Sequence, residues 1–172
     1  MHFFPKQAVL LLLGVSIIQV LCMPGHYLGQ EHDDVQYVLA SRSLLQGQYT
    51  LGVSPGDPPL AFVTPGWPVL LIPAALMSRD FTLGYELWAW LWLVLTNILL
   101  WLWLRSRMKE ASAHLLTTLF ALNPLVLSRS GVVMSEIPGL AFVLITLLFM
   151  ERPKGLLGWK SGLLLAGAWL IR

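Results

Sequence analysis

The sequence predicts an all-α protein, a polytopic transmembrane helix bundle with a long external loop that contains juxtamembrane helices. Of its 172 residues, 56% are hydrophobic and 12% are charged, whereas about 25% of the residues in soluble domains are charged. The apolar residues gather into blocks, and residues 83–104 contain a single charged side chain, Glu86. Blocks of ~20 apolar residues are typical of membrane spans. We therefore exclude a soluble globular protein.

Charge and cysteine content narrow the class further. The formal net charge is +2 and the basic residues are dispersed along the chain, which argues against nucleic-acid binding. The single cysteine, Cys22, excludes an intramolecular disulfide and any CxxC metal or redox motif. Membrane lipid is the partner that this composition predicts.

The first element is an expected span at about residues 7–23. Lys6 followed by the apolar run 8–21 has the form of a secretory signal peptide. No small-x-small cleavage site follows that run. We therefore interpret the segment as an uncleaved span that runs outward from a cytoplasmic N-terminus.

Basic residues orient the other spans, because Lys and Arg near span ends stay on the inner side of the membrane. Spans at about 83–104, 112–127 and 132–150, with an incomplete span at 162–172, place three basic clusters inside and leave residues 24–82 as an external loop. The clusters are Lys6; Arg105, Arg107 and Lys109; and Arg152, Lys154 and Lys160. This topology predicts a multi-pass protein of the cell membrane. Because the last span is cut short, we expect a single N-terminal transmembrane module of a longer protein.

The apolar run 67–77 is too short to be a span. Its 11 residues cover only ~17 Å as a helix, against a hydrocarbon core of ~30 Å. Pro65, Pro68 and Pro73 interrupt it. We expect a juxtamembrane helix in the outer interface, with Trp67 as its interfacial anchor.

The external loop begins with an acidic segment at a predicted helix start. Glu31, His32, Asp33 and Asp34 precede a helix-period stripe of apolar residues that Gly47 terminates as a C′ residue. Asp33 with Gln36 three residues later resembles a capping box, which is the structural interpretation of one acid. Adjacent carboxylates repel one another, so we expect at least one to be functional.

Glu136 is the second candidate acid, four residues into the span expected at 132–150. An ionised group inside a membrane is expensive and marks a functional site by default, although a merely interfacial Glu is the alternative at a depth of ~6 Å. Arg129 precedes it on the same outer side and is available to pair with Glu136 or with a phosphate. Asn123 and Pro124 mark the exit of the preceding helix.

These segments combine into a pattern with defined order and spacing. The first loop reads Asp33-Asp34-x-x-Tyr37-x-x-x-Ala40-x-x-Leu44-Leu45-x-Gly47-x-Tyr49, followed by Thr64-Pro65-Gly66-Trp67-Pro68-x-Leu70-Leu71. The later segment reads Asn123-Pro124-Leu125-x-x-x-Ser128-Arg129-Ser130-x-x-x-Met134-Ser135-Glu136. In these residues the chain resembles the GT-C-type glycosyltransferases, the integral-membrane family that includes the protein O-mannosyltransferases and aminoarabinose transferases.

The resemblance implies transfer of a sugar from a polyprenyl-phosphate carrier to an acceptor on the external face, with inversion. It assigns Asp33 as general base with Asp34 as the alternate, and Glu136 as the acid of the second loop. Tyr37 and Arg129 are the substrate-binding residues that it implies, Arg129 next to the leaving phosphate. As an isolated module we expect the chain to be inactive. The sugar, the carrier lipid and the acceptor, whether lipid, glycan or protein, are left open.

Metal binding and a non-enzymatic role are the remaining alternatives. In some relatives the second-loop acid helps to hold a divalent metal, so Mg²⁺ or Mn²⁺ is the cofactor to consider. His26, His32, Asp33 and Asp34 match no recognised metal-site spacing. A transporter or an assembly subunit would explain the spans but not the acidic loop, because transporters place ionisable groups near the bilayer midplane.

Overall fold

The computed structural model describes residues 5–23, 25, 28–29, 31–52, 54, 56–77 and 82–150, and positions 162, 163, 166, 167, 170 and 171. Within this part of the chain the secondary structure is helical, without strands, which confirms the all-α class. The predicted span 162–172 lies largely outside the described residues. The helices are α1 Lys6–Leu21, α2 His32–Leu44, α3 Gly66–Leu70, α4 Ile72–Met77, α5 Thr82–Arg105, α6 Glu110–Ala121, α7 Pro124–Ser128 and α8 Glu136–Met150.

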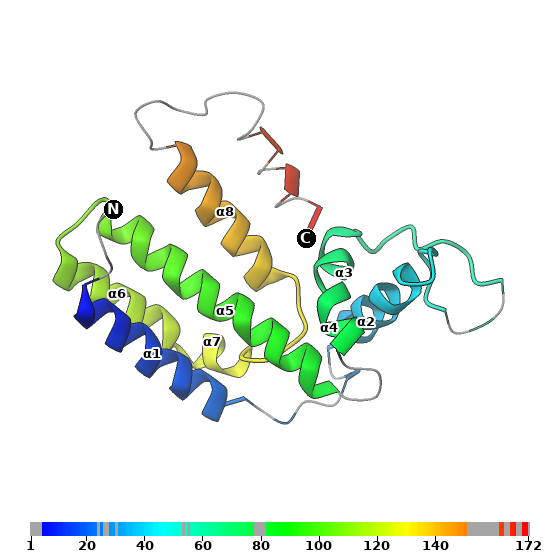
Figure 1. Ribbon diagram of the computed structural model, residues 1–172, viewed down its shortest axis with the longest axis horizontal. Coiled ribbons are helices and arrows are strands. Elements are labelled where there is room, and N and C mark those ends of the chain that lie inside the picture. Colours follow the sequence, from blue (N-terminus) through cyan, green and yellow to red (C-terminus); the bar gives the residue numbers. More distant parts are fainter. Residues whose placement is uncertain are drawn as a thin grey trace.

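Helix α5 lies at the centre, and α1, α4, α6 and α8 all pack against it (Figure 1). Among the described helices it alone is both long and apolar enough to cross a membrane, whereas α1 and α8 are apolar but shorter. Its 24 residues give a length of ~36 Å, which exceeds the ~30 Å of a hydrocarbon core. Of the predicted spans, 83–104 is therefore the one that meets the length test as a single helix.

Buried polar side chains join the ends of α1 and α6 to the middle of α5. Gln19, near the end of α1, accepts a hydrogen bond from the side-chain amide of Asn97 at 3.0 Å and donates one to the carbonyl of Ala121 at 3.1 Å. Ser130, in the turn that follows α7, donates to the backbone carbonyl of Gln19 at 2.7 Å. The end of α6 and the last turns of α1 are therefore joined to α5 at Asn97, and α1 also reaches Trp90, whose indole N–H donates to the carbonyl of Ser16 at 3.3 Å.

Helices α2, α3 and α4 lie near the first half of α5. Trp88 donates its indole N–H to the carbonyl of Leu70 at 2.8 Å, and the rings of Trp67 and Trp92 meet edge to face with centroids 6.2 Å apart. Trp67 is 0% exposed, so the predicted interfacial anchor is wrong: the indole packs in the core between α3 and α5. The run expected to form one juxtamembrane helix forms two, α3 and α4.

Two predicted spans have different boundaries in the structure. The segment expected as one helix at 112–127 is broken into α6 and α7, because the side chain of Asn123 accepts the N–H of Leu125 at 2.9 Å and Pro124 takes the first helical position. The helix expected from 132 begins only at Glu136. Glu136 is therefore the first residue of α8 and does not lie a turn inside it.

Large apolar side chains cover the outer faces of α1 and α6. Their spacing of three or four residues places them on one side of each helix. Each of them is more than half exposed in this chain: Leu10, Leu13, Ile17 and Leu21 on α1, and Leu115 and Leu119 on α6. Exposed apolar stripes of this kind are typical of surfaces that contact a membrane or another protein.

Candidate functional site

A pocket of about 460 Å³ lies between the first turns of α2 and α8. Its polar end is formed by two carboxylates, a phenol and a hydroxyl, and its other end is apolar. The lining residues are Asp33, Tyr37, Met134, Ser135, Glu136, Gly139, Leu140 and Val143. The structure therefore brings together three of the five site residues that the sequence predicted, from segments about one hundred positions apart.

Asp33 reaches this pocket from the first turn of α2. The helix begins at His32, and the residue at its N-cap position is Glu31, whose side chain makes no capping hydrogen bond, so the predicted capping box of Asp33 with Gln36 is wrong. Asp33 is exposed and stands at the pocket wall. A carboxylate in this position is accessible to a substrate hydroxyl, which is the geometric requirement for a general base.

Tyr37 lies one turn after Asp33 and connects the two helices of the pocket. Its hydroxyl lies 3.2 Å from the Oγ of Ser135, directly before α8. Burial raises the pKa of the Tyr37 phenol; the hydrogen bond with Ser135 lowers it, and the nearby charges of Asp33 and Glu136 raise it further. Tyr37 therefore remains neutral at physiological pH, and its hydroxyl is able to donate or to accept a hydrogen bond in the pocket.

Glu136 approaches the same pocket from the beginning of α8. The carbonyl of Ser135 accepts the N–H of Gly139 at 2.9 Å and so starts the helix. The side chain of Glu136 is exposed. Carboxylates are favoured in the first turn by the helix dipole, so helix stability alone accounts for an acid here. Helix stability does not explain why Glu136 lines the same pocket as Asp33.

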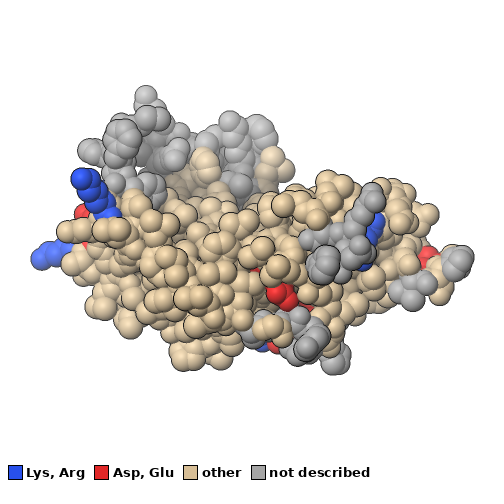
Figure 2. Space-filling view, turned by 60° about the horizontal axis from the view of Figure 1, so that its bottom comes forward, with Lys and Arg blue, Asp and Glu red and all other residues tan. Residues whose placement is uncertain are grey.

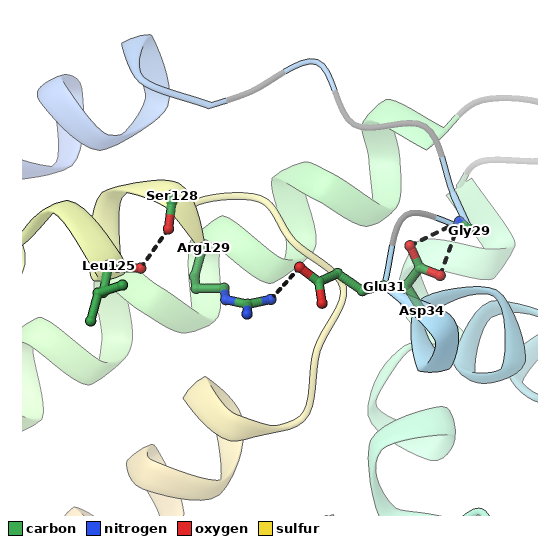
Figure 3. A network of polar contacts seen from close by, with 6 residues as sticks. All are labelled: Gly29, Glu31, Asp34, Leu125, Ser128 and Arg129. Carbon is green, nitrogen blue, oxygen red and sulfur yellow. Dashed lines mark hydrogen bonds and ion pairs between the residues drawn. The ribbon is translucent and has the colours of Figure 1, made fainter.

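Asp34 has a different environment from its neighbour Asp33. It is 2% exposed, and its two carboxylate oxygens each lie 3.0 Å from the N–H of Gly29 (Figure 3). The N–H of Val35 also points to this carboxylate. Gly29 has a φ of +104°, a backbone conformation that favours glycine. These contacts hold the turn that leads into α2 and direct Asp34 away from the pocket.

Arg129 borders a second, smaller hollow of about 270 Å³ that shares Met134 and Glu136 with the main pocket. Its guanidinium lies 2.7 Å from the carboxylate of Glu31 (Figure 3). The sequence suggested Glu136 or a phosphate as the partner of Arg129, and Glu31 was missed because nothing in the local sequence links the two segments. Both side chains are partly exposed, so the pair is screened by solvent.

Metal binding has limited support in the described residues. Asp33 and Glu136 offer the carboxylate oxygens that Mg²⁺ and Mn²⁺ prefer, and both line one pocket. No group of three or more His, Cys, Asp and Glu side chains is close enough to hold an ion in the part of the chain that the structure describes. His26 and the side chain of His32 lie outside that part.

Ser135 contributes a hydroxyl to the pocket, a role that the sequence did not predict. It lies in the motif before Glu136, but its role depends on Tyr37, which is 98 positions earlier in the chain. A scan for hydroxyl residues directly before a predicted helix would have found it as a helix-start residue.

Comparison of the chain with protein-family models, with curated proteins and with solved structures finds no match.

Proposed function

We propose that this chain belongs to a membrane glycosyltransferase that moves a sugar from a polyprenyl-phosphate carrier to an acceptor on the external face. The observation that carries the proposal is the pocket in which Asp33, Tyr37 and Glu136 converge at one end and Leu140 and Val143 line the other. A polar end suits a sugar and an acceptor hydroxyl, and an apolar end suits the lipid that bears one of them. The likeness of both loops to GT-C-type enzymes supports the same assignment.

The membrane location is supported by surface and charge. The exposed apolar stripes of α1 and α6 need a nonaqueous surrounding, and α5 is long enough to cross a bilayer. Basic residues gather where α5 ends and α6 begins. The pocket acids lie away from that end of the molecule, in the first turns of α2 and α8. The positive-inside rule then directs the pocket to the external side.

The chemistry assigns a role to each group. Asp33 accepts the proton of the acceptor hydroxyl. At the same time the oxygen of that hydroxyl attacks the anomeric carbon from the face opposite the phosphate. The bond between that carbon and the phosphate oxygen breaks, the electron pair leaves with the phosphate, and the anomeric configuration inverts. Arg129 neutralises the charge that develops on the phosphate, and Glu136 orients the acceptor.

The direct test is sugar transfer by the protein expressed from its complete gene. Membranes containing it receive radiolabelled polyprenyl-phosphate mannose or polyprenyl-phosphate glucose, and labelled product is counted for Asp33→Asn, Glu136→Gln and the control Asp57→Asn. Asp57 is an acid of the same loop that lines a separate hollow. A lost general base lowers the rate by ~10²–10⁴-fold. Transfer at the unaltered rate in both pocket variants would overturn the enzymatic assignment and favour a non-enzymatic membrane component.

The topology has its own test, which is independent of the substrate. A cysteine placed at Ser54, an exposed loop position, in a Cys22→Ser background should react with a membrane-impermeant thiol reagent added to intact cells. Cys22 is itself exposed, which is why it is replaced. Labelling that requires cell lysis would place the loop inside and refute the proposed orientation.

A further inference from the structure

The ion pair between Arg129 and Glu31 lies beside the candidate site, and the proposed mechanism gives a role to Arg129 alone. The guanidinium lies 2.7 Å from the carboxylate, and Figure 3 shows the two side chains pointing toward each other. Glu31 lies directly before α2, and Arg129 lies directly after α7 in the segment that leads to α8. The pair therefore connects the two segments that lead into the pocket helices.

The backbone holds both residues in place, so the pair can open by movement of the side chains alone. The carbonyl of Glu31 accepts the N–H of Asp34 at 2.9 Å. Arg129 donates its N–H to the carbonyl of Val126 and accepts the N–H of Val132, each at 3.2 Å. The side chain of Arg129 is 45% exposed and that of Glu31 is 37% exposed. An ion pair with this exposure contributes little, because water competes for both charges, so an incoming anion can replace Glu31 at low cost.

The charge around the pocket is mostly negative. Asp33 and Glu136 line the pocket with exposed side chains. Figure 2 shows acidic side chains near the middle of the displayed face, away from the basic side chains at its left end. Among the described residues, Arg129 is the cation that lines the two hollows next to Glu136. A phosphate that enters this acidic region needs a cation beside it, and Glu31 already neutralises that cation.

The charge of the phosphate changes during the proposed reaction. In the donor the phosphate is a diester with one negative charge. After its bond to the anomeric carbon breaks, it is a monoester with a charge of about −1.5 to −2 at pH 7. A guanidinium attracts the product more strongly than the donor for this reason. An unpaired Arg129 would therefore retain the spent carrier, and a carboxylate that competes for Arg129 lowers this affinity.

We propose that Glu31 is a positioning residue that competes with the carrier phosphate for Arg129 and so sets the affinity of the site for donor and product. This inference rests on the proposed function, in which Arg129 contacts the phosphate. Glu31 holds the guanidinium in the protein without ligand, and the phosphate of the donor replaces its carboxylate. After transfer, Glu31 pairs with Arg129 again as the polyprenyl phosphate leaves. Glu31 neither gives nor takes a proton in this exchange.

The experiment measures binding of a fluorescent polyprenyl phosphate to the protein expressed from its complete gene and purified in a mild detergent. An exposed ion pair of ~0.2–1 kcal/mol favours its closed form by about 1.4- to 5-fold, and the apparent affinity falls with the fraction of Arg129 that is open. E31Q should therefore bind the lipid about two to six times more tightly than the unaltered protein, and R129Q should bind it more weakly. The control E110Q removes an acid that is 40% exposed at the start of α6 and should leave the affinity unchanged.

A double-mutant cycle separates exchange at Arg129 from general repulsion between Glu31 and the phosphate. In an R129Q background, E31Q should change the affinity by less than about 1.5-fold. Equal tightening in both backgrounds would show that Glu31 acts by general repulsion and would overturn the proposal. Unchanged or weaker binding by E31Q, or unchanged binding by R129Q, overturns it as well. The same response of E31Q to fluorescent phosphatidylglycerol would overturn the assignment of the phosphate to the polyprenyl carrier.

Sugar transfer by the same samples distinguishes failure of this proposal from failure of the proposed function. The KM for the donor should fall in E31Q, because an interaction that opposes binding has been removed, whereas a structural defect would lower kcat or the Tm. Transfer with an unchanged donor KM in E31Q would overturn the role of Glu31 and leave the transferase assignment in place. Full transfer by Asp33→Asn and Glu136→Gln would overturn the transferase assignment, and the lipid titration would still decide whether Glu31 competes for Arg129.

Discussion

The adjacent acids Asp33 and Asp34 are predicted to fail in different ways when each is changed to asparagine. Asp34 is 2% exposed and accepts the backbone N–H of Gly29 with both oxygens, each at 3.0 Å. Asparagine keeps one oxygen but replaces the other with an NH₂ group that opposes an N–H. The substitution therefore removes the charge from these hydrogen bonds and places two donors face to face.

The cost follows from the difference between charged and neutral hydrogen bonds. Hydrogen bonds to charged groups contribute ~1.5–3 kcal/mol and neutral ones ~0.5–1.5 kcal/mol, so Asp34→Asn should lower the free energy of unfolding by ~1–2 kcal/mol. In a chain of this size that corresponds to a fall in Tm of ~2–8 °C. Asp33 is exposed and lies at the pocket wall, so Asp33→Asn should change stability by less than ~0.5 kcal/mol.

Thermal unfolding and limited proteolysis of the detergent-purified protein measure the two effects. Asp34→Asn should unfold earlier and expose the segment 24–82 to protease, while Asp33→Asn should match the unaltered protein in both assays and lose sugar transfer. The refuting result is the reverse pattern. If Asp34→Asn keeps the Tm of the unaltered protein but loses transfer, Asp34 contacts the substrate and its structural role is wrong.

Four further predictions test the other contacts. Glu31→Gln should cost less than ~1 kcal/mol in thermal unfolding because its pair with Arg129 is partly exposed; a larger cost contradicts a screened pair. Gln19→Leu should lower the free energy of unfolding by ~1–2 kcal/mol, because each of two hydrogen bonds in a membrane protein contributes ~0.6 kcal/mol and their partners are left unpaired. An unchanged Tm would show that the bonds of Gln19 to Asn97 and Ala121 do not stabilise the fold. Burial raises the pKa of Tyr37, so the folded state holds the phenol proton more tightly than the unfolded state does. The free energy of unfolding should therefore fall as the pH rises above 10, and Tyr37→Phe should make that measured fall shallower. Gly139→Leu should fill open pocket space and raise helix stability by up to ~1 kcal/mol while lowering sugar transfer; unchanged transfer would show that substrate does not use this wall.

Periodicity and composition were sufficient to predict the helices whose residues are apolar on every side. The expected span 83–104 matches α5, Thr82–Arg105, within one residue at each end, because a long run with one charge has no local competitor for helix. Asn123 and Pro124 were also recognised as a helix exit, since the exit depends on cap chemistry between neighbours, although the expected span 112–127 continued past them. Local rules are reliable where the interactions that decide the structure are local.

Long-range packing decided what the sequence could not supply. Trp67 was assigned to the interface because tryptophan is enriched at membrane interfaces, but it packs against Trp92, 25 positions later. Glu31 and Arg129 meet across nearly one hundred residues, and no spacing pattern relates them. Only the family resemblance ranked Asp33 above Asp34 in the sequence, and the contact of Asp34 with Gly29 is what distinguishes their environments in the structure.

The position of Glu136 changes the reason for considering it functional. From sequence the argument was one of cost, because an acid one turn inside a span is expensive. In the structure Glu136 is exposed at the first position of α8, where an acid is inexpensive and even favoured, so its presence requires no function. The functional case now depends on convergence: Asp33 and Glu136 line one pocket, and the hydrogen bond between Tyr37 and Ser135 joins the helices that carry them. The helix dipole favours each acid separately but does not explain why both line one cavity, and the proposed substrate that contacts both acids is our explanation for that convergence.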